Sequence, residues 1–348
     1  MPDKPTQRLY RYIYGNWFTM VVRTYAELDL ATLLAENPLT AEELSAKTDT
    51  DPIALTLLLR AAEDMGLHVR DVDTEKLSLT DTGRLLSSTT DGNLRAAAIL
   101  NGADYRYEPW GQLPAFVRTG SGKGLSPTWE NGSLPYLAER PEQLAIFQEA
   151  MSDLSRNSLK GEDENEEIAQ AINFSEHPKI IDIGGGTGSL LQAIGRHHPN
   201  CELTLFDLSE VLQQTSESDP SANHIHHLSG NFLKEISVGY SAYLFKNVLH
   251  NHQPEPLHQI LSHLAQALQK SPRNARAYFC ELLRDDTKAG RGRNSLTDLN
   301  LNLLVGGRIR SKEEYEELLK EHGLRISTLI SLSSSHRKIL IIAKEEDR

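Results

Sequence analysis

Short apolar runs alternate with helical repeats along the second half of the chain. The run Lys179–Ile183 is β-branched and apolar and stops at a cluster of glycines, which is typical of a buried strand. Residues 189–196 follow with apolar side chains at helical spacing. This alternation continues to the end of the chain and predicts an α/β fold with a mostly parallel sheet. Further strands are predicted at residues 201–207, 224–232, 242–252, 277–283 and 338–344, the last at the far side of the sheet.

The first helical segment, residues 9–36, has apolar and aromatic side chains at three- and four-residue steps, among them Tyr10, Trp17 and Tyr25. This spacing predicts one or two amphipathic helices. So much aromatic surface needs something that covers it. Either the chain's own core or a second copy of the chain does so, and we favour a dimer interface.

Residues 39–90 predict two helices followed by two short strands. Thr40 and Glu43 have the spacing of a capping box, and Asp51 begins a second helix that Gly66 ends. Two helices and a hairpin form a winged-helix-like arrangement, which in other proteins binds DNA. These residues carry ten acidic and five basic side chains, however, which is the wrong balance for contacts with phosphates. We therefore predict a structural or dimerisation module.

Residues 94–160 have the pattern of helices with interruptions. Residues 119–135 are rich in Gly, Ser and Pro, which predicts a loop. Phe147 and Met151 lie one turn apart on a helical face, and this periodicity alone favours packing in a core. The acidic stretch at residues 161–167 predicts a solvated helix start, because its spacing suits no set of metal ligands.

The glycines after the first strand form the pattern G-x-G-x-G, and Asp182 stands two residues before Gly184. A dinucleotide site has the pattern G-x-G-x-x-G, but in this chain Ser189 stands where the third glycine of that pattern would be. Glycines let the backbone turn sharply and approach a ligand without a Cβ in the way. An acid at Asp182 suits a ligand with a cationic ammonium group and no pyrophosphate. The pattern predicts a nucleoside-binding corner, and a tight turn without a ligand is the alternative.

Composition narrows the class of protein. The 348 residues allow one large domain or two ordinary ones, and a hydrophobic share of 39% is enough to form a core. A net charge of −12 argues against a nucleic-acid or anionic-membrane partner. Cys201 and Cys280 lie in apolar runs, which predicts buried thiols in a reducing compartment. With no signal-peptide pattern and no apolar run near the roughly 20 residues that cross a bilayer, we expect a soluble, cytoplasmic protein.

Several motifs, spread over nearly the whole chain, occur together in one family. They are the glycine pattern at residues 182–188, Asp207-Leu208, Gly-Asn-Phe at residues 230–232, Lys246 with His250 four residues later, Glu281 at the end of a strand, and residues 298–308, which end in Gly-Gly-Arg. The chain thus resembles the dimeric small-molecule O-methyltransferases, the caffeate and flavonoid type of plants with its bacterial natural-product relatives. These enzymes use S-adenosylmethionine (SAM).

The resemblance implies a division of the chain into three parts. Residues 1–100 are expected to form a mainly α, winged-helix-like dimerisation domain. Residues 101–165 are expected to form a helical connector that contributes to the acceptor pocket. Residues 166–348 are expected to form a Rossmann-like, SAM-binding catalytic domain. The implied partners are a small-molecule acceptor and a second copy of the chain, with no nucleic acid and no membrane.

The resemblance also implies site residues. His250 would act as the general base, since imidazole titrates near neutral pH, and Glu281 would accept from its other nitrogen. The family's acceptor pocket moves our interpretation of Phe147 and Met151 from core to pocket. The cofactor would contact Asp182, Gly184, Gly186, Asp207, Leu208, Asn231, Phe232 and Lys246. The acceptor pocket would include Trp110, Phe147, Met151, Asn251, Leu301 and Asn302.

Three sites depart from the family pattern. Asn251 and His252 follow the histidine where Asp-Trp is usual. Asn231 replaces an aspartate, although its carboxamide oxygen can still accept a hydrogen bond from the adenine amine. Ile309 stands where a glutamate usually braces the catalytic histidine, so we expect His250 to be less well oriented and less basic. His250 and His252 have no third metal ligand at a suitable spacing, so no metal is expected.

Three functions stay open on the sequence alone. The first is methyl transfer from SAM to a hydroxyl of a small secondary metabolite, preferably a phenol, because an acidic acceptor tolerates a weakened base. The second is a non-methylating reaction with bound SAM, such as decarboxylation, hydroxylation or a pericyclic step, which Asn251 and Ile309 motivate. The third is a non-catalytic, dimeric binding protein. The acceptor itself, and methylation of nitrogen or carbon instead of oxygen, also stay open.

Overall fold

A computed structural model describes residues 4–130, 132–156, 163–218, 224–284, 294–333 and 337–345 of the chain. The chain divides into two compact units. The first comprises Met1–Tyr107 with Ala145–Leu154, and the second comprises Glu108–Leu144 with Ser155–Arg348. The three-part division expected from the sequence stays a prediction.

The first unit is mainly helical and contains one small antiparallel sheet. Residues 9–36 lie in three helices and not in one or two, because the chain bends at Tyr14 and at Asp29, whose φ is 54°. The capping box is present, since the Thr40 hydroxyl accepts from the Glu43 N–H at 3.2 Å. The elements of this unit are α1 (Pro5–Ile13), α2 (Gly15–Glu27), α3 (Leu30–Glu36), α4 (Ala41–Thr48), α5 (Pro52–Asp64), β1 (His68–Arg70), β2 (Leu77–Leu79), α6 (Asp81–Arg84), α7 (Arg95–Gly102), the start of α8 (Asp104–Gly111) and most of α11 (Pro141–Arg156).

The second unit is built on a sheet that has seven strands within the described residues, in the order β5-β4-β3-β6-β7-β9-β8. The first five strands in this order are parallel, and β9 is antiparallel to both of its neighbours. The predicted α/β fold is therefore confirmed, with a mixed sheet. The strands are β3 (Lys179–Ile183), β4 (Glu202–Asp207), β5 (Ile225–Ser229), β6 (Ala242–Lys246), β7 (Arg276–Leu282), β8 (Leu324–Ser331) and β9 (Arg337–Lys344).

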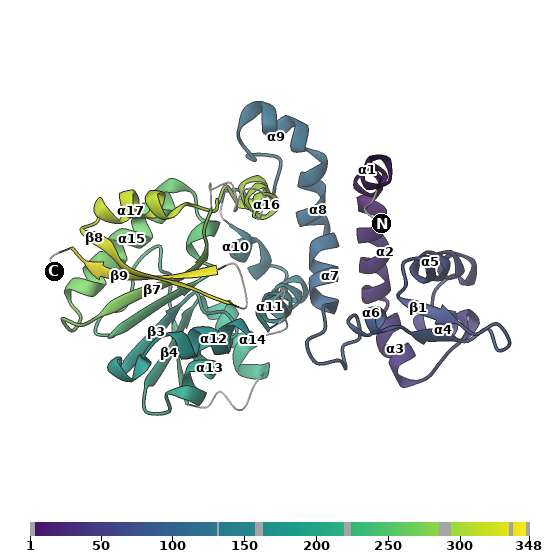
Figure 1. The fold of residues 1–348 in the computed structure, drawn as a ribbon, viewed down its shortest axis with the longest axis horizontal. Coiled ribbons are helices and arrows are strands. Elements are labelled where there is room, and N and C mark those ends of the chain that lie inside the picture. The colour runs from purple at the N-terminus through teal and green to yellow at the C-terminus, as the bar shows by residue number, and fades with distance from the viewer. Residues whose placement is uncertain are drawn as a thin grey trace. The chain divides into compact units, whose positions relative to one another are not determined.

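Helices cover both faces of this sheet (Figure 1). Successive side chains of a strand point to opposite faces, so Ile180 packs with α12 and α13 while Ile181 packs with α15. The helices of this unit are α9 (Leu113–Thr119), α10 (Ser133–Ala138), α12 (Glu164–Ala171), α13 (Ser189–His197), α14 (Ser209–Ser218), α15 (Pro254–Gln269), α16 (Ser295–Val305) and α17 (Lys312–Lys320), with short 3₁₀ helices at Phe174–Glu176 and Leu249–Asn251.

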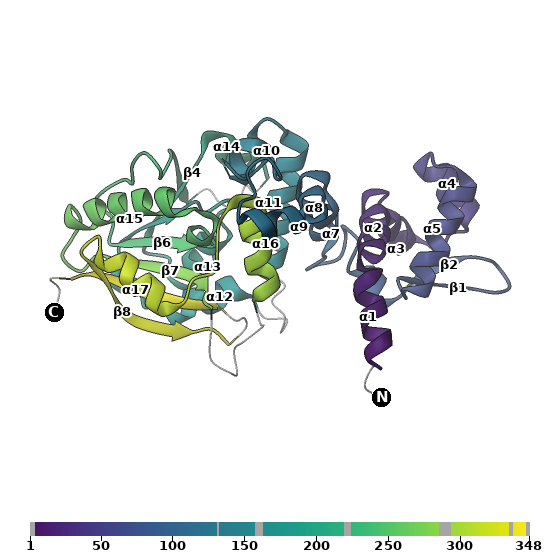
Figure 2. The same cartoon turned by 90° about the horizontal axis from the view of Figure 1, so that it is seen from above.

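Two of the predicted strands need correction. The strand predicted over residues 242–252 ends at Lys246, because Asn247 has a φ of 60° and turns the chain into the 3₁₀ helix Leu249–Asn251. The last strand, β9, lies inside the sheet beside β7, and the edge position belongs to β8 (yellow in Figure 2). No strand is predicted from the sequence over Leu324–Ser331, where β8 lies.

The acidic stretch also differs from its prediction. Asp163 caps α12 by accepting from the Asn165 N–H at 2.8 Å, so a helix does start here. Glu164 and Asn165, however, are buried and not solvated. Residues 161 and 162 of this stretch lie outside the described residues.

Both cysteines are free thiols, and Cys280 is buried while Cys201 is only half-buried. Within the described residues, no helix combines the length and the apolar character that crossing a membrane requires. The same residues contain no group of three or more His, Cys, Asp or Glu side chains placed to hold a metal ion.

Candidate active site

The parallel strands of the second unit end at one edge of the sheet, and their last residues form the candidate site. The glycine turn follows Ile183 at the end of β3. Asp207 ends β4, Lys246 ends β6 and Glu281 is the last but one residue of β7. In open α/β sheets, ligands bind outside the carboxyl ends of the strands, which makes this edge the place to look for chemistry.

The glycine turn depends on backbone conformations that residues with a Cβ rarely adopt. Gly184, Gly186 and Gly188 have φ values of 69°, 59° and 73°. At Gly185, an added Cβ would lie 2.7 Å from a carboxylate oxygen of Asp182. The Gly184 N–H donates to the carbonyl of Phe206 at 2.8 Å and ties the turn to β4. The turn over the end of β3 therefore depends on its glycines, and of these only Gly186 has no protein atom within 4 Å of the position that a Cβ would take.

Asp207 shapes this turn from the neighbouring strand. Its carboxylate accepts from the Gly186 N–H at 2.9 Å and from the Leu208 N–H at 2.8 Å. Burial raises the pKa of Asp207, and these two hydrogen bonds act in the opposite direction. Asp207, which is predicted to contact the cofactor, therefore lies next to the glycine turn and already holds it through its carboxylate.

Asp182 is almost fully buried, and its Oδ1 has no hydrogen-bond partner among the described residues. Burial raises the pKa of Asp182 to about 7, Lys246 lowers it and Asp207 raises it further. A buried acceptor that lacks a donor is costly, by about 1–3 kcal/mol in general. A ligand that brings N–H donors would satisfy it.

Lys246 lies in a buried ionic cluster beside Asp182. Its Nζ is 3.5 Å from Glu164, and Glu164 also accepts two hydrogen bonds from Arg337, at 3.0 and 3.1 Å. Burial lowers the pKa of Lys246, and Glu164 opposes this shift. Arg337 Nε donates to Asn247 Oδ1 at 2.8 Å, so the cluster also holds the residue that turns the chain toward His250.

His250 lies in the 3₁₀ helix after β6 and is buried except for a small fraction of its surface. Its Nδ1 is hydrogen-bonded to Glu281, which is fully buried. The other Glu281 oxygen accepts from the Leu249 N–H at 2.9 Å. If the Nδ1–H donates to Glu281, Nε2 carries the free lone pair and is the basic nitrogen.

Arg310 also braces the 3₁₀ helix Leu249–Asn251, a role that the sequence did not indicate. Its guanidinium donates to the carbonyls of Leu249 at 3.4 Å and His252 at 3.2 Å. Ile309, which replaces the family glutamate, buries its side chain, and its N–H donates to Asp298 at 2.6 Å. Two side chains therefore hold the 3₁₀ helix: Glu281, through the Leu249 N–H, and Arg310, through the Leu249 and His252 carbonyls. No motif marks Arg310, so only its position in the fold reveals this role.

His252 is a neutral aromatic side chain in this setting. Burial lowers its pKa to about 4, and the positive charge of Arg310 contributes to the shift. Its ring meets that of Phe232 edge to face at 5.5 Å between centroids. The neighbouring Asn251 amide donates to the Asn247 carbonyl at 2.7 Å. The Asn231 carboxamide oxygen accepts from the Leu233 N–H at 2.8 Å, so it stabilises the turn that presents Phe232.

Comparison with known proteins decides the family. Residues 110–325 match the family model of the O-methyltransferase domain, and residues 10–89 match that of the O-methyltransferase dimerisation domain. The chain belongs to the SAM-dependent O-methyltransferase family.

Several of its relatives are bacterial O-methyltransferases that are named for natural products. The O-demethylpuromycin O-methyltransferase of Streptomyces alboniger is 28% identical over 92% of this chain and 84% of its own length. The phenazine O-methyltransferase of Lysobacter antibioticus is 26% identical over 94% of this chain and 93% of its own. The solved structure of a mitomycin 7-O-methyltransferase is 26% identical, covers 97% of each chain and has a TM-score of 0.85. This chain is thus an O-methyltransferase of the secondary-metabolite type.

The residues predicted for the acceptor pocket of this O-methyltransferase are distributed over both units. Trp110 Nε1 donates to Asn300 Oδ1 at 3.1 Å, which ties the end of α8 to α16. Leu301 is half-buried on the same helix, and Asn302 donates to the Gly307 carbonyl at 3.1 Å, so its amide closes the helix end. Phe147 and Met151 lie on the part of α11 that belongs to the first unit, and both are partly exposed. The roles of these residues toward an acceptor stay predictions.

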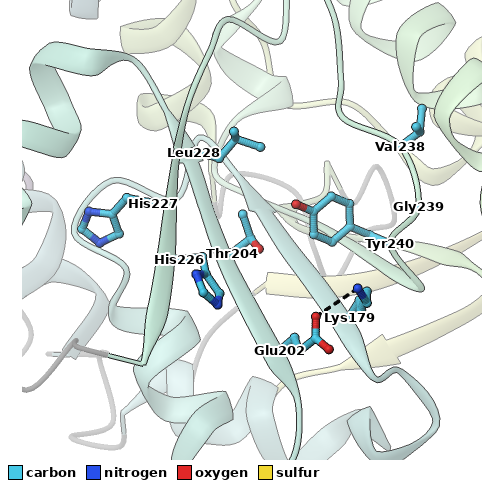
Figure 3. A pocket seen from close by; sticks show the side chains of 9 residues that line it. All are labelled: Lys179, Glu202, Thr204, His226, His227, Leu228, Val238, Gly239 and Tyr240. Carbon is cyan, nitrogen blue, oxygen red and sulfur yellow. Dashed lines mark ion pairs between the residues drawn. The ribbon is translucent and has the colours of Figure 1, made fainter.

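A hollow of about 350 Å³ opens elsewhere on this O-methyltransferase, at the amino ends of β3 and β4 (Figure 3). Residues 230–241 connect β5 to β6 without a helix, and Val238, Gly239 and Tyr240 of this connection border the hollow. The Lys179–Glu202 ion pair, at 3.1 Å, borders this hollow, together with exposed His226. The amino ends of the strands are opposite to the glycine turn and His250, so this hollow is distinct from the candidate site.

Proposed function

We propose that this O-methyltransferase transfers the methyl group of SAM to a phenolic hydroxyl of a small secondary metabolite, with His250 as the general base. The observation that carries the proposal is the buried His250–Glu281 pair at the sheet edge that also holds the glycine turn. A relative from Streptomyces cremeus, a 3-amino-4-hydroxybenzoate 4-O-methyltransferase that is 27% identical, is named for a phenolic acceptor.

The cofactor would fit the described residues. Asp182 would receive its ammonium group, and Asp207 with Leu208 would meet its ribose. Phe232 and His252 supply aromatic surface for its adenine. Bound SAM would supply a methyl group on a sulfonium sulfur, and the neutral thioether that remains when the S–C bond breaks is an excellent leaving group. At Gly186 no protein atom lies within 4 Å of the position that a Cβ would take, so the backbone there is open to such a nucleoside.

The protein's own part in the reaction is to hold the acceptor in line and to take its proton. His250 Nε2 would accept the hydroxyl proton as the new O–C bond forms. Glu281 would then stabilise the imidazolium through Nδ1–H, since its carboxylate is fully buried. A phenol, with an ordinary pKa near 10, gives up its proton to imidazole far more readily than an aliphatic alcohol. No observation on the described residues favours a non-methylating reaction.

Incubation with methyl-labelled SAM and a panel of phenols tests the proposal. We expect label in a phenol, and we expect His250→Gln to lower kcat by about 10²–10⁴-fold while the Kd for SAM changes less than about threefold. His226→Gln, in an exposed histidine of β5, is the matched control and should retain activity. Undiminished transfer by the His250 variant would remove the base from the mechanism. Tight SAM binding without transfer to any phenol would contradict the proposed acceptor class.

A further inference from the structure

Helix α12 brings a second unpartnered acceptor to the glycine turn. Asn165 is 2% exposed, and its Nδ2 donates to the hydroxyl of Ser189, the first residue of α13, at 3.4 Å. Its Oδ1 has no hydrogen-bond partner among the described residues. Buried amide oxygens almost always accept a hydrogen bond, so this one calls for a donor from outside the chain.

The neighbours of Asn165 place it at the amino-acid end of the proposed cofactor site. The preceding residue, Glu164, is 3.5 Å from Lys246 Nζ. Lys246 in turn interacts electrostatically with Asp182, the other buried side chain here that has an unpartnered oxygen. Ser189 begins the helix that follows the glycine turn. The two unpartnered oxygens thus flank one turn, from β3 and from α12.

The chemistry of the two oxygens selects the ligand group. Both are acceptors, so a carboxylate or phosphate would find no donor in them, whereas an ammonium group has three N–H donors. The three acids here, Glu164, Asp182 and Asp207, outnumber the two basic side chains that pair with Glu164, which are Lys246 and Arg337, so the balance favours a cation over an anion. A neutral amide adds an acceptor without adding a further buried negative charge.

We propose that Asn165 Oδ1 accepts a hydrogen bond from the α-ammonium group of the bound cofactor, beside Asp182. This inference rests on the proposed function and adds a cofactor contact that no motif marks. Its consequence is selectivity, because a nucleoside ligand that lacks the ammonium group would gain nothing from Asn165.

Calorimetry with two ligands tests the contact. The first is S-adenosylhomocysteine (SAH), and the second is its deaminated analogue, in which hydrogen replaces the ammonium group and the carboxylate is kept. We expect Asn165→Leu, which has nearly the same shape, to raise the Kd for SAH about tenfold and to leave the Kd for the analogue within about twofold. Gln170→Leu, in an exposed residue of the same helix, is the control and should change neither.

The outcomes separate the possible failures. An equal loss for both ligands would mean that Asn165 only supports the fold, and no loss for either would mean that it does not contact the cofactor. If Asn165→Leu does not fold, Asn165→Asp keeps an acceptor oxygen and should retain the wild-type preference for SAH, and loss of that preference would overturn the proposal. A wild-type chain that binds neither ligand would overturn the proposed function itself.

Discussion

At the scale of single residues, one buried carboxylate organises the proposed chemistry. Glu281 uses one oxygen for the His250 imidazole and the other for the Leu249 N–H. The same side chain therefore sets the imidazole's direction and the backbone that carries it. A charged group in so dry a place is stable only when its oxygens are satisfied, and here both are.

The titration of Asp182 predicts how cofactor affinity depends on pH. Without ligand, the pKa of Asp182 is raised to about 7 by burial. A cofactor ammonium beside it favours the charged carboxylate and lowers that pKa, so the complex binds fewer protons than the free protein. Affinity for SAH should therefore fall as the pH drops below 7, by up to about tenfold per pH unit.

Calorimetry between pH 5.5 and 8.5 measures this dependence. Repeating the titrations in two buffers of different ionisation enthalpy counts the released protons. Asp182→Asn keeps the shape of the side chain and removes its titration, so its affinity should be weaker at pH 8 and nearly flat with pH. A wild-type affinity that does not change across this range would contradict an ammonium contact at Asp182.

At the scale of elements, the turn after α16, at residues 306–308, contacts the 3₁₀ helix Leu249–Asn251 directly. The Arg308 N–H donates to the His250 carbonyl at 2.9 Å. A Cβ on Gly307 would lie 2.1 Å from that same carbonyl oxygen. The chain thus needs glycine here because the two backbones pack against each other, whatever the φ.

This close approach predicts the effect of Gly307→Ala. The added methyl group must push away the 3₁₀ helix that carries His250, and overpacking of this kind typically costs about 1–3 kcal/mol. We expect a loss of that size in the free energy of unfolding by urea and a loss in kcat that exceeds any change in the Kd for SAH. Gly111→Ala is the matched control, because no atom lies within 4 Å of the position that its added methyl group would take. Equal behaviour of the two variants would mean that the contact at His250 has no catalytic importance.

At the scale of the whole molecule, the apolar surface of the N-terminal helices indicates self-association. No residue of α1 is buried, and Tyr12 and Trp17 are 72% and 63% exposed. Contiguous apolar surface of this kind usually marks an interface. The match of residues 10–89 to a dimerisation domain supports the same interpretation, and we propose a homodimer.

Sedimentation of the wild-type chain and of Trp17→Glu tests the homodimer. A charge buried in an interface without a partner is strongly unfavourable, so we expect a dimer for the wild type and at least about a tenfold weaker dimer for the variant. Val72→Glu introduces the same charge at an apolar residue between β1 and β2 that is 84% exposed, and should leave the dimer unchanged. A monomeric wild-type chain at micromolar concentration would contradict the proposal.

The sequence by itself determined the features whose signals are local. The strand, glycine turn and helix at residues 179–197 follow from three signals within some twenty residues: β-branched side chains, glycines that allow a positive φ, and helical periodicity. The capping box at Thr40 and helix α5, which ends at Asp64 shortly before Gly66, are equally local. Together with the family motifs, these signals were sufficient for the α/β fold and for the positions of His250 and Glu281.

Only the tertiary structure decided which polar groups are buried and what they meet. Glu164 and Asn165 belong to an acidic stretch that predicts solvation, yet they are buried at the candidate site. Glu164 pairs there with Arg337, 173 residues away in sequence. Arg310 likewise acquires its role because it meets carbonyls of a turn about 60 residues earlier. Periodicity reports the conformation of neighbouring residues, whereas burial and pairing depend on segments that only folding brings together.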